Sequence, residues 1–146
     1  MSWYYKMPEA TAQAIDKDGW LHTGDLGIID SEGYLFIKGR SKNMILGPSG
    51  QNIYPEEIED RLNALPYVSE SLVIEKDGKL IALVYPDYEV VKKEKISPEQ
   101  LKTKMDENRK LLNHMLPMYS QVARLKIQET EFEKTPKRSI KRYLYQ

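Results

Sequence analysis

The pattern of hydrophobic and polar positions changes several times along the chain and predicts the elements of the fold. Residues 26–30 and 34–40 are two runs of β-forming residues. Residues 31–33 between them end in a glycine that tolerates a positive φ, so this region predicts a β-hairpin. Residues 1–24 follow neither a helical nor a strand period and are expected to be irregular.

A helix is predicted to begin at Pro55. Ile58, Leu62 and Leu65 form an apolar stripe at helical spacing through about residue 65. Proline suits the first helical position, and the glutamates that follow it complement the positive end of the helix dipole. The preceding segment, residues 46–52, is so rich in glycine that a helix is excluded and a strand is disfavoured.

Two further strands are predicted downstream of this helix, at residues 71–75 and 80–85. The Asp77-Gly78 pair between them is a strong hairpin signal. The charged segment 92–95 that follows is expected to be solvated.

A second helix is predicted from a capping box, which residues 97–100 have in the form Ser-Pro-Glu-Gln. Pro117 ends it, and residues 122–127 predict a last strand. Its expected apolar face carries Leu101, Met105, Leu112 and Met115, with Asn108 interrupting and His114 packed nearby. The order helix, strand, strand, helix, strand after residue 52 predicts an α+β fold, a small β-sheet with packed helices.

Composition narrows the function classes. The 146 residues carry 22 basic and 22 acidic side chains, so the formal net charge is zero and no global field attracts nucleic acid or a membrane. The absence of cysteine excludes disulfides and thiolate chemistry, and two separated histidines do not suggest a metal site. No apolar run approaches the roughly 20 residues that span a bilayer. We expect a cytoplasmic protein that is at most peripheral to a membrane.

Asp25 and Arg40 are the first candidate site residues, because a hairpin turning at residues 31–33 places them at its two open ends. A carboxylate after a glycine accepts hydrogen bonds from two vicinal hydroxyls, and arginine binds phosphate or ribose oxygens. The alternatives are that Asp25 caps a turn and that the two side chains form a surface salt bridge of little energy. Local sequence favours these alternatives.

The glycine-rich segment and the C-terminal tail are weaker candidates. Residues 47–52 match neither the P-loop nor the dinucleotide fingerprint, and a plain loop is the simpler interpretation. Residues 134–142 hold five cations in nine positions. Such a run is usually solvated, and binding of nucleic acid or a nucleotide phosphate is its functional alternative.

The order of these motifs is more specific than any one of them. The stretch "GWLHTGDLGIIDSEGYLFIKGRSKNMI" resembles the adenylate-forming (AMP-binding) enzyme superfamily. "YYKMPEAT" before it, "GPSGQNIYPEEIE" after it and "EFEKTPKRSIKRYLY" at the end are similar to the neighbouring motifs of that superfamily. The combination looks most like bacterial long-chain fatty-acid–CoA ligases.

The resemblance implies a two-step ligase reaction. A carboxylate attacks the α-phosphate of ATP to give an acyl-adenylate, and the CoA thiol then displaces AMP. It implies that residues 1–41 are the end of a large N-terminal AMP-binding domain and that residues 42–146 are a mobile C-terminal domain. ATP, the fatty acid, CoA and Mg²⁺ would be bound mainly by the part of the large domain that this chain lacks, so the chain alone is expected to be inactive.

The resemblance also assigns roles to single residues. Asp25 matches the aspartate that binds the ribose hydroxyls of ATP, and Arg40 matches an arginine that contacts the nucleotide. Lys42 falls at the hinge about which the small domain rotates. Gly50 matches the glycine whose small size lets the pantetheine arm of CoA pass. His22 and Thr23 receive no catalytic role, and Trp20 and Leu21 are expected to anchor their loop by packing.

The last motif departs from the superfamily pattern, in which Pro-x-Gly-Lys supplies a lysine for the α-phosphate. Here Arg138 stands at the glycine position and Ser139 at the lysine position. Lys137 and Lys141 flank this position, and a lysine arm is long and flexible enough to substitute. We predict that Lys141 replaces the missing lysine, because it precedes Arg142 as in other basic Lys-Arg endings of the superfamily. Lys137, or no tail lysine at all, remains an alternative.

The expected partners are small molecules and the protein's own large domain, with no nucleic acid. A rival interpretation from another class is a non-catalytic module that binds nucleotides or nucleic acid through its basic tail. Within the family, a carrier protein's pantetheine arm is an alternative acceptor to free CoA. The sequence does not name the acid.

Overall fold

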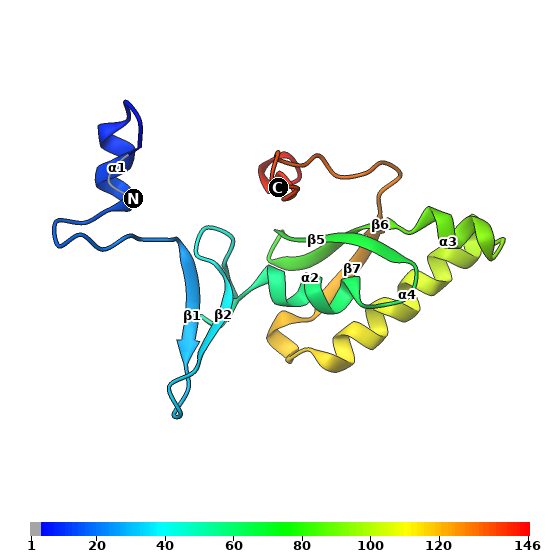
Figure 1. Cartoon of the computed structure of the whole chain (residues 1–146). Helices are drawn as coiled ribbons and strands as arrows, with labels where there is room; N and C mark the ends of the chain where they lie inside the picture. Colours follow the sequence, from blue (N-terminus) through cyan, green and yellow to red (C-terminus); the bar gives the residue numbers. More distant parts are fainter. Residues whose placement is uncertain (1–3) are drawn as a thin grey trace. The chain divides into compact units, whose positions relative to one another are not determined.

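A computed structural model describes residues 4–146, and the chain forms two compact units, residues 1–42 and 43–146. We call them the N-terminal unit and the C-terminal unit. Figure 1 shows a helix and a β-hairpin in the first unit, and helices against a small sheet in the second. No helix in the described part of the chain is long and apolar enough to cross a membrane.

The N-terminal unit contains α1 (Pro8–Ala14), β1 (Asp25–Ile29) and β2 (Leu35–Arg40). β1 and β2 pair antiparallel, which confirms the predicted hairpin. Its turn forms because the Asp30 carboxylate accepts the backbone N–H groups of Glu32 and Tyr34, each at 2.9 Å. Helix α1 lies in a segment that we expected to be irregular, with proline in its first turn and a glutamate favourable to the dipole.

Apolar side chains of the N-terminal unit lie exposed. Trp20 is 73% exposed and Leu21 47%, so the expectation that they anchor their loop by packing is wrong for this chain. The hairpin also exposes Ile28, Ile29, Tyr34, Leu35, Phe36 and Ile37. Every buried hydrophobic residue within residues 4–146 belongs to the C-terminal unit. The hairpin therefore presents an apolar surface without a core of its own.

The C-terminal unit is built on a sheet of β5 (Val68–Lys76), β6 (Lys79–Pro86) and β7 (Val122–Ile127), in the order β5-β6-β7. β5 and β6 are antiparallel, as the Asp77-Gly78 pair predicted. Both turn residues have positive φ, 53° and 71°, which is the geometry that such a pair favours in a two-residue hairpin. β7 lies parallel to β6, so the chain between them crosses over.

Three helices belong to this unit: α2 (Pro55–Asn63), α3 (Tyr88–Lys93) and α4 (Pro98–Met115). The predicted capping box of α4 is present, since the Ser97 hydroxyl accepts from the Gln100 N–H and the Gln100 side chain accepts from the Ser97 N–H. Helix α3 was not foreseen. Asp87 caps it through the N–H groups of its first turn, and it includes part of the segment expected only to be solvated.

Short elements complete the unit. β3 (Ile45–Leu46) and β4 (Asn52–Ile53) pair antiparallel and close the glycine-rich segment into a loop. The 3-10 turn η1 (Met118–Ser120) comes directly before β7. A second 3-10 turn, η2 (Arg142–Leu144), lies near the end of the tail. The α+β fold class is confirmed.

The main core lies between the helices and one face of the sheet, where α2 and α4 pack (Figure 1). Leu101, Met105 and Leu112 of α4 are buried as predicted. Met115 is 46% exposed and His114 is also exposed, so their predicted packing is wrong. Asn108, expected to interrupt the face, is buried and donates to the Pro66 carbonyl at 2.7 Å.

The second face of the sheet is covered by the C-terminal tail. Phe132 is 3% exposed and packs with Leu72, Ile74 and Leu83 of β5 and β6. Ile140 and Tyr145 lie against the same cluster. Successive side chains of a strand point to opposite faces of the sheet, so the strands contribute to two cores, one facing the helices and one facing the tail.

Candidate functional site

The loop that leads into the hairpin is organised by hydrogen bonds to short polar side chains. The Asp16 carboxylate accepts from the N–H groups of Trp20 (2.8 Å) and Asp18 (3.0 Å). These backbone contacts, the first of them above all, lower the pKa of Asp16, with a smaller contribution from His22. The Thr23 hydroxyl accepts from the Asp25 N–H at 3.1 Å. His22 and Thr23 thus act in the local structure of the loop.

Asp25 and Arg40 meet at the open end of the hairpin. Their Cα atoms are register partners in β1 and β2, and Arg40 Nη1 lies 2.8 Å from Asp25 Oδ1. Their proximity, expected from the hairpin, is confirmed. Both side chains keep solvent contact, with 35% of Asp25 and 59% of Arg40 exposed. The pair therefore offers a carboxylate and a guanidinium to a polar ligand at one point of the N-terminal unit.

Lys42, the predicted hinge residue, is the last residue of the N-terminal unit and is exposed. The glycine loop follows in the C-terminal unit. Gly50 has a φ of +81° and open space where a Cβ would stand, so its backbone favours glycine and no atom of residues 4–146 crowds it. A cavity of about 480 Å³ adjoins the loop, lined by Gly47, Pro48, Ser49, Lys79, Met118 and Tyr119 among others.

The tail forms a closed loop that displays Lys141. Lys134 and Ile140 form a bridge, and the Lys141 N–H donates to the Glu133 carbonyl at 2.8 Å. The turn between them places Arg138 at a φ of +61°, a conformation that suits the glycine usual at this position in the resembling motif. Lys141 Nζ lies 3.2 Å from Glu133 Oε2, with 31% of its side chain exposed.

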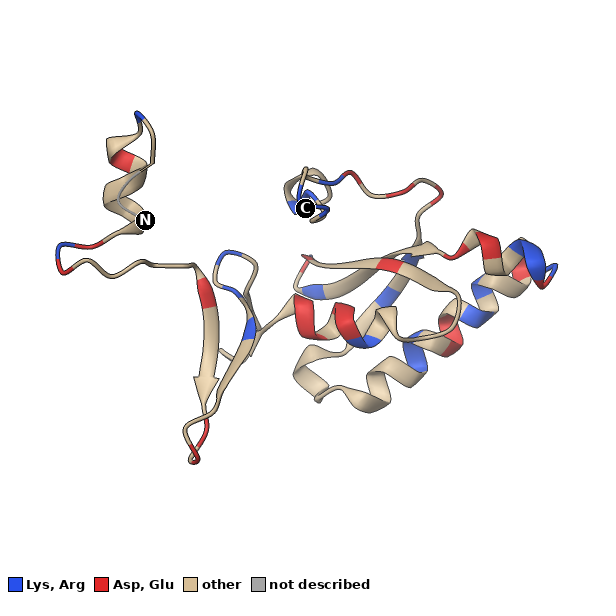
Figure 2. Ribbon diagram, in the orientation of Figure 1, with Lys and Arg blue, Asp and Glu red and all other residues tan. Residues whose placement is uncertain are grey.

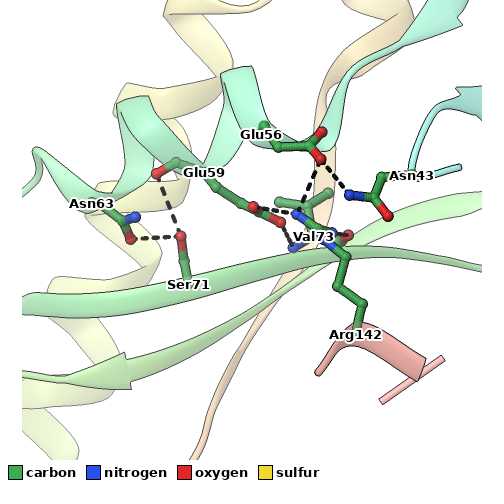
Figure 3. Close-up of polar contacts among 7 residues, drawn as sticks. All are labelled: Asn43, Glu56, Glu59, Asn63, Ser71, Val73 and Arg142. Carbon is green, nitrogen blue, oxygen red and sulfur yellow. Dashed lines mark hydrogen bonds and ion pairs between the residues drawn. The ribbon is translucent and has the colours of Figure 1, made fainter. Parts of the chain in front are cut away.

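Arg142 ties the tail to the body of the unit. Its guanidinium pairs with the Glu59 carboxylate of α2 and donates to the Val73 carbonyl of β5 at 3.3 Å (Figure 3). Glu59 also accepts the Val73 N–H at 2.6 Å. Burial raises the pKa of Glu59, and the Arg142 charge opposes this shift. No local pattern predicts this pair, since its members lie 83 positions apart.

The tail cations are largely matched by acids. Lys134 pairs with Glu70 and Glu131, Lys141 with Glu133, and Arg142 with Glu59. In Figure 2, acidic positions lie along the tail ahead of its cluster of basic positions, and others lie on α2. Three of the five tail cations thus already have carboxylate partners, which weakens the interpretation of the tail as a nucleic-acid-binding arm. In the described part of the chain, no three His, Cys, Asp or Glu residues form a metal-ligating group.

Residues 42–145 match the sequence profile of a known family, the AMP-binding enzyme C-terminal domain. The chain belongs to this family. The match confirms the resemblance to adenylate-forming enzymes that the motifs indicated, and it makes the chain a member of an enzyme family.

Curated relatives of this AMP-binding C-terminal domain are ligases. The chain is 49% identical over 85 residues to the long-chain-fatty-acid–CoA ligase FadD13 of Mycobacterium tuberculosis, covering 56% of this chain and 16% of the relative. It is 38% identical over 120 residues to the putative acyl-CoA synthetase YngI of Bacillus subtilis, covering 82% of this chain and 21% of the relative. The chain therefore spans at most about a fifth of the length of these two relatives.

Solved structures share the fold of this AMP-binding C-terminal domain and its preceding segment. A fatty acyl CoA synthetase of M. tuberculosis is 35% identical with a TM-score of 0.52, covering 97% of this chain and 26% of that one. The adenylation domain of a carboxylate reductase from Mycobacterium chelonae has a TM-score of 0.84 over 97% of this chain and 24% of that one. At 24% identity the latter similarity shows the fold alone.

Proposed function

We propose that this chain is the C-terminal part of an ATP-dependent acyl-CoA ligase that converts a long-chain fatty acid to its adenylate and then to its CoA thioester. The family match over residues 42–145 carries the proposal. The name of the relative FadD13 supports a long-chain fatty acid as the substrate. The chain alone would catalyse neither step, since it spans a small share of such relatives.

The domain division is part of the proposal. Residues 1–41 would close the large N-terminal domain and residues 42–146 would be the mobile domain. Two observations support this boundary: the compact units meet between Lys42 and Asn43, and the family match begins at residue 42. The exposed apolar hairpin would then pack against the rest of the large domain.

Asp25 and Arg40 would hold the nucleotide in this scheme. The Asp25 carboxylate would accept hydrogen bonds from the two ribose hydroxyls, and Arg40 would exchange part of its contact with Asp25 for an oxygen of the nucleotide. Their 2.8 Å contact supports this because it holds both groups in place before the ligand arrives. Mg²⁺, if required, would offset phosphate charge and be held mainly outside this chain.

Lys141 would stabilise negative charge that develops on the α-phosphate during adenylation. A cation at that point acts more strongly on the transition state than on the ground state. Glu133 would have to release the lysine, because the two now form an ion pair at 3.2 Å. In the thioester step the loop at Gly50 would leave room for the pantetheine arm of free CoA or of a carrier protein.

The test joins this chain to the large domain of FadD13, in place of that relative's matching C-terminal segment. Acid-dependent exchange of pyrophosphate into ATP reports the first half-reaction, and thioester formation reports both. We expect both activities in the fusion and neither in the chain alone. A folded fusion that lacks both activities, while unmodified FadD13 retains them, contradicts the proposal. The long-chain assignment needs a separate test, in which a panel of acids is assayed with this chain joined to the protein's own upstream sequence. A preference of that enzyme for short acids would contradict the assignment.

A further inference from the structure

The ion pair between Glu59 and Arg142 is an uncommon way to fasten a tail. Only 11% of the Glu59 side chain and 15% of the Arg142 side chain are exposed. The desolvation of such a pair offsets much of its attraction, so buried pairs contribute little to stability compared with apolar packing. The raised pKa of Glu59 reflects this cost of burial. The tail also has apolar anchors, Phe132, Ile140 and Tyr145, that hold it on the sheet.

The pair is instead well suited to fixing one position along the chain. Its two members take both backbone groups of Val73: Glu59 accepts the N–H at 2.6 Å and Arg142 donates to the carbonyl at 3.3 Å (Figure 3). Glu56 adds a second carboxylate 4.0 Å from the guanidinium. A planar guanidinium held by a carboxylate and a carbonyl fixes direction as well as distance. Residue 142 is therefore locked in register against β5 and α2.

Lys141 is the residue directly before this lock. Its own N–H is bonded to the Glu133 carbonyl, on the other limb of the tail loop. That limb is held in turn, because the Tyr145 hydroxyl accepts the Glu133 N–H at 2.9 Å and the Tyr145 ring stands edge-on to Phe132. The backbone at Lys141 is thus held in place from both limbs of the tail loop, while its ammonium group stays partly exposed beside the Glu133 carboxylate.

We propose that Glu59 and Arg142 are positioning residues that hold Lys141 in place for the adenylation half-reaction. The inference rests on the proposed function and extends it to two residues that touch neither substrate nor reacting atoms. The Arg142 guanidinium fixes the backbone from which the Lys141 side chain extends, and the Glu59 carboxylate holds that guanidinium in place. Loss of either contact lets the lysine sample positions away from the phosphate.

The experiment uses the FadD13 fusion and a double-mutant cycle. Arg142→Lys keeps the charge but lacks the guanidinium, Glu59→Gln keeps an acceptor for the Val73 N–H but lacks the charge, and Lys141→Ala removes the proposed reacting group. Arg138→Lys is the matched control in the exposed turn of the same tail. Pyrophosphate exchange and thioester formation from supplied acyl-adenylate are measured separately, with far-ultraviolet circular dichroism as the check of folding.

We expect Arg142→Lys to slow pyrophosphate exchange by about 10- to 100-fold, the scale of a misplaced catalytic group. Thioester formation from acyl-adenylate should stay within about twofold, because the lock acts through a group used in the other step. In the Lys141→Ala background, Arg142→Lys should add less than about twofold, since coupled residues are not additive. Glu59→Gln should follow the same pattern, and Arg138→Lys should leave both steps unchanged.

Three results would overturn the inference while leaving the proposed ligase reaction intact: full exchange activity in Lys141→Ala, equal loss of both steps in Arg142→Lys, or additive losses in the cycle. The first of them would also remove the role proposed for Lys141. A parent fusion without either activity would instead refute the proposed function and the inference with it. If Arg142→Lys does not fold, the Glu59→Gln cycle decides by the same criteria.

Discussion

Replacing Phe132 with alanine should loosen the tail from the second face of the sheet. The ring is 3% exposed and lies in a cluster with Leu72, Ile74 and Leu83. It also stands edge-on to Tyr145, with ring centroids 5.2 Å apart. Phenylalanine-to-alanine changes at such sites cost about 3–5 kcal/mol, of which an aromatic pair accounts for about 0.5–1.5 kcal/mol. We therefore expect a loss of about 4 kcal/mol in unfolding free energy.

The assay is urea unfolding of the 146-residue chain, with far-ultraviolet circular dichroism as the signal that is monitored. This signal reports mainly the C-terminal unit, because the helices α2 and α4 lie there. Tyr143→Ala is the matched control, since Tyr143 is an aromatic residue of the same tail but 70% exposed. The control should change the unfolding free energy by at most about 0.5 kcal/mol. Equal effects of the two substitutions would refute the reasoning that the tail is part of the core.

Three further outcomes are expected. Ser97→Ala should cost about 1 kcal/mol in the same urea assay through loss of the capping box, whereas Ser97→Asp should retain most of the stability. Because the pKa of Glu59 is raised in the folded state, its ionisation opposes folding. The stability of the wild type relative to Glu59→Gln should therefore be largest below the ordinary pKa of 4.5 and fall as pH rises through the raised value. A flat difference across pH would contradict the shift. In the fusion, Lys42→Pro should spare one half-reaction and cripple the other, because proline fixes φ at the hinge; equal loss of both in a folded protein would argue against a hinge there.

Features encoded by neighbouring residues were predictable from the sequence. The capping box at Ser97 and the turn at Asp77-Gly78 depend on contacts within a few positions, and both formed as expected. The proximity of Asp25 and Arg40 followed from the hairpin alone. The nucleotide role that we propose for that pair does not follow from local chemistry, since the same contact serves equally as a surface salt bridge.

Features that depend on distant partners were not predictable. Met115 continues the apolar stripe of α4, yet it is the last residue of the helix and is 46% exposed. Asn108 interrupts the apolar pattern of α4, and its burial is not predictable from that pattern because its acceptor, the Pro66 carbonyl, lies 42 positions away. From its sequence the tail is interpreted as a solvated basic run, because the carboxylate that binds Arg142 belongs to a distant element, α2. Sequence periodicity reports the faces of single elements, whereas these outcomes depend on how the elements pack.

The most direct test of the central claim is thioester formation by the FadD13 fusion when it is supplied with a long-chain fatty acid, ATP and CoA. We predict acyl-CoA formation that depends on ATP and that falls sharply when Asp25 is replaced by alanine. A folded fusion that produces no acyl-CoA, beside an active FadD13 control, would contradict it.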